Sequence, residues 1–107
     1  MGLFGFGFME PDINAEVQTC RATEGSLLVD VRDEGEFAEG HIPGAINLPL
    51  PQVLAAQGLP PRKDVPLCVY CRSGARSARA VQALRQLGYA GARNIGGITA
   101  WRGELEP

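Results

Sequence analysis

Cysteine and histidine are scarce in this sequence of 107 residues, and their scarcity excludes several ways of building a small protein. The three cysteines, Cys20, Cys68 and Cys71, are an odd number and do not make a disulfide framework. A structural zinc site needs four ligands, but the pair Cys68-x2-Cys71 has no second pair and His41 is the only histidine. A domain of this length buries roughly 60–70% of its unfolded surface. We therefore expect a domain that folds around an apolar core, with no metal and no other cofactor.

Blocks of like charge and long apolar runs are missing too. The net charge is −2, and the ten basic residues are spread along the chain. No apolar run reaches the roughly 18 residues that suggest a transmembrane helix. We therefore expect neither nucleic acid nor a membrane as a partner.

Residues 1–9 form an apolar segment in which glycine alternates with Phe4, Phe6 and Phe8. The alternation has the period of a strand, whereas the glycines weaken a strand interior. The segment is too short for a signal peptide and has no basic region before it. We expect an N-terminal extension or an edge strand here, then one domain over residues 10–107, in the cytoplasm, where a free thiol persists.

A cysteine stands between an apolar run and a helix-forming run. Residues 65–70 are typical of a short buried strand, and residues 77–87 carry apolar side chains at helical spacing. Cys71 therefore opens a tight strand-to-helix turn, where backbone N–H groups and the helix N-terminus favour an anion. A thiol in such a place ionises easily, and the thiolate is the nucleophile. The turn predicts a reactive Cys71 in an anion-binding loop.

Helices and strands alternate along the rest of the chain. We expect helices at 14–20 (capped by Asn14), 33–40 (opened by a capping box of Asp33 and Glu36), 49–56 and around Trp101, and strands at 27–31, 46–48 and 93–95. This alternation favours an α/β fold with a parallel sheet covered by helices on both faces. In such sheets the ligand binds beyond the carboxyl ends of the strands, where Cys71 is expected.

Three segments together resemble the rhodanese family of thiosulfate sulfurtransferases. They are DVRDEGEFAEGHIPGAINLP at 30–49, YCRSGARS at 70–77 and NIGGITAW at 94–101. The resemblance implies about five parallel strands flanked by helices, and a catalytic cysteine, here Cys71, that carries a persulfide. It also implies thiosulfate as a small anionic sulfur donor and cyanide or a thiol as the acceptor, with a thioredoxin-like or sulfur-carrier protein as further candidates.

The active-site loop is expected to comprise Cys71 and the residues that follow it, namely Arg72, Ser73, Gly74, Ala75, Arg76 and Ser77. Gly74 lets the backbone turn tightly around the sulfur. Arg72 is expected to receive thiosulfate and Arg76 to close the loop from within. Ser73 and Ser77 are hydroxyl donors to the sulfur, although Ser77 is equally a helix cap.

Residues outside the loop are expected to support it. Asp30 and Arg32 look like a structural pair in which Arg32 bridges carboxylates and backbone near the loop. His41 is interpreted as fixing a turn, and Trp101 as packing the last helix on the core. Cys68 lies three positions before Cys71 on the same strand and therefore points to the opposite face, as a buried, inert thiol. A resolving role for Cys68 under oxidation is the alternative.

Two other classes of function stay open from the sequence. One is a binding or regulatory module that keeps the fold without turnover. The other is a small phosphatase or arsenate reductase. The family that this chain resembles also includes phosphatases of the cell-cycle type, which have a Cys-x5-Arg loop, whereas Cys71 and Arg76 make Cys-x4-Arg. The shorter loop makes a smaller ring of N–H donors, sized for sulfur, so sulfur transfer is favoured.

Overall fold

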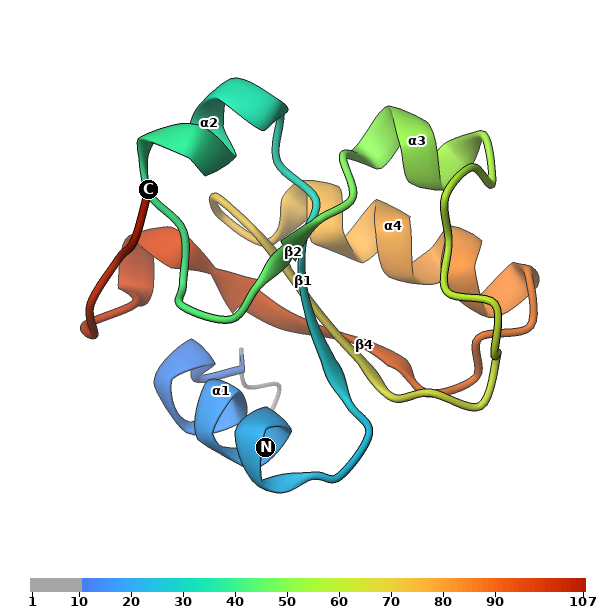
Figure 1. Ribbon diagram of the computed structural model, residues 1–107, viewed down its shortest axis with the longest axis horizontal. Helices are drawn as coiled ribbons and strands as arrows, with labels where there is room; N and C mark the ends of the chain where they lie inside the picture. The colour runs from blue at the N-terminus through green and yellow to red at the C-terminus, as the bar shows by residue number, and fades with distance from the viewer. Residues whose placement is uncertain (1–10) are drawn as a thin grey trace, which may run out of the picture.

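A parallel sheet lies at the centre of the fold, in the order β2-β1-β3-β4 (Figure 1). The computed structural model describes residues 11–107. Its elements are α1 (Ile13–Ala22), β1 (Leu27–Asp30), α2 (Glu34–Glu39), β2 (Ile46–Asn47), α3 (Leu50–Leu54), β3 (Leu67–Cys71), α4 (Ala75–Gln86), β4 (Ala92–Gly97) and the 3-10 helix η1 (Ile98–Ala100).

The predicted parallel α/β fold is confirmed, with one difference in strand number. Residues 11–107 provide four strands, where the family resemblance implied about five. The strand considered for Phe4, Phe6 and Phe8 falls outside the described residues.

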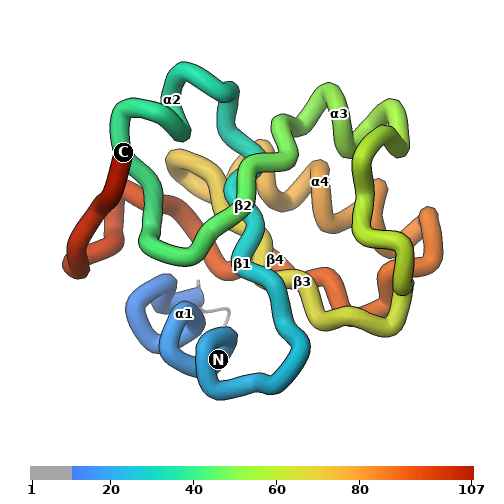
Figure 2. The backbone as a smooth tube through the Cα atoms, viewed as in Figure 1, coloured from blue at the N-terminus to red at the C-terminus, as the bar shows by residue number. Residues whose placement is uncertain are grey.

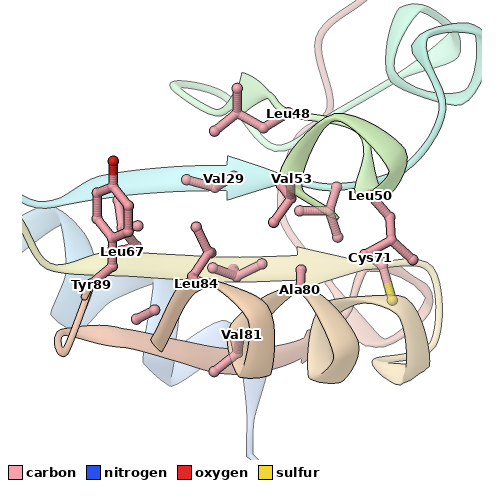
Figure 3. Packing of buried hydrophobic residues seen from close by; sticks show 13 residues of the cluster. Val29, Leu48, Leu50, Val53, Leu67, Cys71, Ala80, Val81, Leu84 and Tyr89 are labelled. Atoms are coloured by element: carbon pink, nitrogen blue, oxygen red, sulfur yellow. The ribbon is translucent and has the colours of Figure 1, made fainter. Parts of the chain in front are cut away.

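Helices cover both faces of the sheet. The tube in Figure 2 shows α1 on one side and α3 with α4 on the other. Figure 3 shows how Leu84 of α4 and Val53 of α3 pack against Val29 and Leu67 of the strands. Parallel strands that are buried on both faces form a near-continuous apolar run, as β3 does with all five of its residues buried.

The alternation of side chains along β3 separates its two cysteines. Leu67, Val69 and Cys71 belong to the cluster under α3 and α4, whereas Cys68 and Tyr70 belong to the cluster under α1. The prediction that Cys68 and Cys71 face opposite sides is confirmed, because successive side chains of a strand alternate between the faces.

Two predicted helix starts have different outcomes. The capping box that opens α2 is present: Glu36 accepts a hydrogen bond from the Asp33 N–H at 3.0 Å. The prediction that Asn14 caps α1 is wrong, since Asp12 accepts from the Asn14 N–H at 3.0 Å and is itself the N-cap, two residues earlier. The Asn14 side chain instead bonds the Ala100 carbonyl and the Arg102 N–H, which ties α1 to the end of the chain.

The end of the chain packs back onto the domain. Trp101 follows η1, is half-buried against the cluster under α1, and donates its indole N–H to the Glu104 carbonyl. His41 and Glu106 exchange backbone hydrogen bonds at 2.8 and 2.9 Å, and His41 Nδ1 lies 2.9 Å from the Phe37 carbonyl. These contacts agree with the structural interpretation of Trp101 and His41. No helix within residues 11–107 is long and apolar enough to cross a membrane.

Candidate active site

Cys71 is the last residue of a central strand and lies under the loop that leads into α4. The loop is three residues long, Arg72 to Gly74, and is shorter than the sequence predicted. The strand β3 ends one residue later than predicted, and α4 begins two residues earlier. The Gly74 N–H donates to Cys71 Sγ at 3.0 Å, and the Ser77 hydroxyl lies 3.4 Å from the same sulfur. The sulfur therefore faces donors from both the loop and the first turn of the helix.

Burial and hydrogen bonding act in opposite directions on this thiol. Burial in the sheet raises the pKa of Cys71, because it disfavours the charged form. Hydrogen bonds from the Ser77 hydroxyl and from the backbone N–H groups of Ser77, Gly74 and Ser73 lower it, and together they outweigh burial. The net effect is a lowered pKa, so the site stabilises a thiolate more than water does.

Two glycines make the tight loop possible. Gly74 has φ +101°, in the region that side chains disfavour. At Gly97 the need is space: a Cβ there would lie 2.3 Å from the Arg72 carbonyl oxygen and 2.7 Å from Ser73 Cα. The end of β4 thus presses directly against the loop backbone.

Asn94 and Thr99 hold the loop carbonyls, and the sequence analysis assigned neither of them a role. The Thr99 N–H and hydroxyl lie 3.3 and 3.2 Å from the Arg72 carbonyl. Asn94 Nδ2 donates to the Gly74 carbonyl at 3.1 Å. Since the C=O and N–H of a trans peptide point in opposite directions, holding the Arg72 carbonyl outward turns the Ser73 N–H toward the sulfur. A polar side chain within the short predicted strand 93–95 was the available signal for Asn94.

Arg76 does not close the loop as predicted. Its guanidinium binds the Glu36 carboxylate with two hydrogen bonds, of 2.7 and 3.1 Å. The difference arises because position 76 is in the first turn of α4 and faces α2, where Glu36 is available. The Arg76 hydrogen bonds hold the pKa of Glu36 at about 2.

The remaining loop residues differ in exposure and in whether they donate hydrogen bonds to the sulfur. Arg72, Ser73 and Ala75 are exposed, and Ser77 is buried. Ser73 contributes its backbone N–H to the sulfur. Ser77 contributes both its N–H and its hydroxyl, as expected of a donor.

Asp30 and Arg32 form a buried pair at the neighbouring strand end. The Arg32 guanidinium donates to the Asp30 carboxylate at 2.7 and 3.0 Å and to the Gly40 carbonyl at 2.7 Å. Asp30 is in register with Tyr70, next to Cys71 in β3. Arg32 thus bridges a carboxylate and the backbone as predicted, beside the loop.

Cys68 has a neighbour that the sequence did not reveal. Cys20 of α1, which had no evident partner in the sequence, lies beside it in the cluster under α1. Burial and the Cys20 thiol raise the pKa of Cys68 to about 12, which keeps it protonated. Because Cys68 lies on the opposite face of β3 from Cys71, the alternative of a resolving thiol does not fit the structure. Within the described part of the chain, no cluster of three metal-ligating side chains occurs.

Comparison with known proteins agrees with this architecture. A family model described as a rhodanese-like domain matches residues 14–104. The chain belongs to this family.

Two relatives and one solved structure show how close the similarity is. A sulfurtransferase of Allochromatium vinosum is 43% identical over 94 residues, covering 86% of each chain. The thiosulfate:glutathione sulfurtransferase of Homo sapiens is 36% identical and covers 85% of this chain and 89% of its own. The crystal structure of a rhodanese-like domain protein from Staphylococcus aureus superposes with a TM-score of 0.76 at 31% identity, covering 92% of this chain and 97% of that one. These relatives support sulfurtransferase activity in general.

Replacement of Gly97 by alanine tests the contact between β4 and the loop. Gly97 has φ −124°, so the cost of the substitution is steric. We expect Gly97→Ala to destabilise the protein by about 1–3 kcal/mol, because the added methyl forces the Arg72 carbonyl to move. Urea denaturation measures the change. Gly35→Ala in exposed α2 is the control, where nothing lies within 4 Å and alanine should be neutral or stabilising. Equal midpoints for Gly97→Ala and wild type would contradict the prediction.

The ion pair of Glu36 and Arg76 should make stability depend on pH. The folded pKa of Glu36, about 2, lies below its usual value of 4.5, so the pair stabilises the protein above pH 4.5 and loses this effect as the pH falls toward 2. Because 32% of the Arg76 side chain and 28% of the Glu36 side chain are exposed, solvent screens the pair, and we expect it to contribute about 1 kcal/mol to the free energy of unfolding. Glu36→Gln should therefore lower the free energy of unfolding at neutral pH, and the difference from wild type should shrink toward zero in acid. Glu34→Gln, an exposed neighbour, is the control; a difference that persists unchanged in acid is inconsistent with the pair.

Proposed function

We propose that this protein is a sulfurtransferase that carries a sulfane sulfur as a persulfide on Cys71. The observation that carries the proposal is the ring of donors around the Cys71 sulfur, from the N–H groups of Ser73, Gly74 and Ser77 and the Ser77 hydroxyl. Backbone N–H donors fixed in this way stabilise negative charge without reorganisation, both on a thiolate and on the terminal sulfur of a persulfide, and the Ser77 hydroxyl adds a donor to the thiolate.

The proposed reaction has two displacement steps. In the first, the Cys71 thiolate attacks the outer sulfur of thiosulfate; the S–S bond of thiosulfate breaks, and its electron pair leaves with sulfite. In the second, an acceptor thiolate or cyanide attacks the terminal sulfur of the persulfide, and the electron pair of that S–S bond returns to Cys71. The lowered pKa of Cys71 increases the fraction of thiolate, which reduces the need for a separate general base.

Thiosulfate and thiols are the favoured donor and acceptor classes. The human relative is named for thiosulfate and glutathione, which supports this pair of substrates. Arg72 is exposed in the loop and is our candidate for binding the sulfonate end of thiosulfate. A thioredoxin-like or sulfur-carrier protein remains a candidate acceptor, and the reducing cytoplasm is the expected compartment because the proposed chemistry needs a free thiol.

The short loop favours sulfur transfer over phosphate chemistry. Three residues separate β3 from α4, and the guanidinium of Arg76 is bound to Glu36. A ring of this size, with the Arg76 guanidinium already paired, suits a single sulfur atom better than a tetrahedral oxyanion.

Mass spectrometry of the intact protein after incubation with thiosulfate tests the persulfide. We expect one added sulfur atom, removed by cyanide or a small thiol and absent in Cys71→Ser. Cys20 and Cys68 remain in that variant as internal controls for sulfur on other thiols. If neither thiosulfate nor a polysulfide adds sulfur, the proposal fails, and the binding module becomes the better interpretation.

Replacement of Arg72 tests how the donor is recognised. We expect Arg72→Ala to raise the KM for thiosulfate about 3- to 10-fold, as expected for the loss of one exposed charge contact. Loading from a neutral organic polysulfide should be unchanged, because that donor has no sulfonate. Arg79→Ala, an exposed arginine further along α4, is the matched control and should leave both donors unaffected. An equal loss with both donors would show that Arg72 shapes the loop instead.

A further inference from the structure

The hydroxyl of Ser77 has more acceptors around it than it has protons. Ser77 is fully buried, and its Oγ lies 3.4 Å from Cys71 Sγ, 3.1 Å from the Gly74 carbonyl and 2.8 Å from Asn94 Oδ1. A serine hydroxyl donates one hydrogen bond and accepts others. The proton can serve the sulfur, the Gly74 carbonyl or Asn94, and the shortest of the three distances is to Asn94.

The orientation of the Asn94 amide is determined by its other partners. The Gly96 N–H, which can only donate, lies 3.0 Å from Asn94 Oδ1. The Gly74 carbonyl, which can only accept, lies 3.1 Å from Asn94 Nδ2. A flipped amide would lose both bonds, so the atom that faces Ser77 is the oxygen, an acceptor only.

We propose that Asn94 is a positioning residue that competes with the Cys71 sulfur for the single hydroxyl proton of Ser77. While Cys71 is a thiol, Ser77 donates to Asn94 Oδ1 and can accept from the S–H. When the thiol loses its proton to solvent, the sulfur becomes an acceptor only. The Ser77 proton then turns to the sulfur. Ser77 Oγ and Asn94 Oδ1 are left 2.8 Å apart with no proton between them, which is unfavourable. Asn94 thereby makes the free thiolate less stable than the loop alone would.

The proposed competition needs no charged group, although the Arg76 guanidinium favours the Cys71 thiolate through its charge and Arg72 is exposed next to Cys71 in the loop. Arg76 of α4 is bound to Glu36, and at the end of β1 Asp30 is bound to Arg32. Helix α3, which packs on the same face, has no charged residue. On β4 the charged residue is Arg93, which pairs with Glu16 of α1. Asn94 is neutral and acts through Ser77.

The competition between Asn94 and the sulfur also affects the proposed sulfur transfer. This role of Asn94 in turnover rests on the proposed function. In the persulfide the negative charge lies on the terminal sulfur, and Cys71 Sγ becomes a weak acceptor. Ser77 can then return its proton to Asn94. The pair therefore favours the loaded form over the free thiolate, and slows discharge by making Cys71 a poorer leaving group.

Titration of the Cys71 thiol tests the competition without any sulfur donor, so its outcome is independent of whether the protein transfers sulfur. Ultraviolet absorbance of the thiolate is followed against pH, with the signal of Cys71→Ser subtracted. We expect Asn94→Ala to lower the pKa of Cys71 by about 0.5–1 unit, the scale of one neutral hydrogen bond. In the Ser77→Ala background the same substitution should have no effect. A rise in the pKa, or an equal shift with and without Ser77, would overturn the proposal, because both indicate a loosened loop.

A matched asparagine and a second variant complete the test. Asn47 bonds the carbonyls of Asp30 and Arg32 at the neighbouring strand end, so Asn47→Ala removes similar bonds and should leave the pKa of Cys71 unchanged. If Asn94→Ala does not fold, Asn94→Asp, which retains the shape, replaces it. Its added charge raises the pKa of Cys71 in any background, and the proposal requires a smaller rise when Ser77 is alanine. Equal rises would overturn it.

Discussion

The contact between Gly97 and the backbone of Arg72 is the constraint on which the candidate site depends. Because no Cβ separates them, the end of β4 lies directly against the loop after β3. Thr99 then reaches the Arg72 carbonyl, and Asn94 reaches the Gly74 carbonyl. With the Arg72 carbonyl held away from the sulfur, the Ser73 N–H turns toward Cys71. The loop is thus shaped from outside, by a strand that follows it in the sequence.

The buried position of Cys71 makes these hydrogen bonds effective. The sheet removes water from the sulfur, which by itself disfavours a thiolate. The same removal of water strengthens each hydrogen bond to the sulfur, since no solvent competes for it. A lowered pKa therefore results from several fixed donors acting together, and it is sensitive to where the one proton of Ser77 lies.

The arginines around the loop have different tasks. Arg32 binds Asp30 and Gly40, and Arg76 binds Glu36, so both use their charge within the protein. Arg32 thereby links the end of β1 to the end of α2, and Arg76 links α2 to the first turn of α4. Arg72 is exposed at the loop itself, and for this reason it is the arginine that we assign to the donor.

The sequence by itself determined the local features. A cysteine between a buried strand and a helix, a glycine in the turn, the capping box of Asp33 and Glu36, and the opposite faces of Cys68 and Cys71 all follow from short-range rules of backbone and side-chain geometry. Only the tertiary structure decided the rest. Arg76 meets Glu36 across 40 residues, Asn94 of β4 and Thr99 of η1 reach the loop, and Cys20 lies beside Cys68. Such contacts depend on how the elements pack, because spacing along one chain segment carries no information about what another segment brings alongside it.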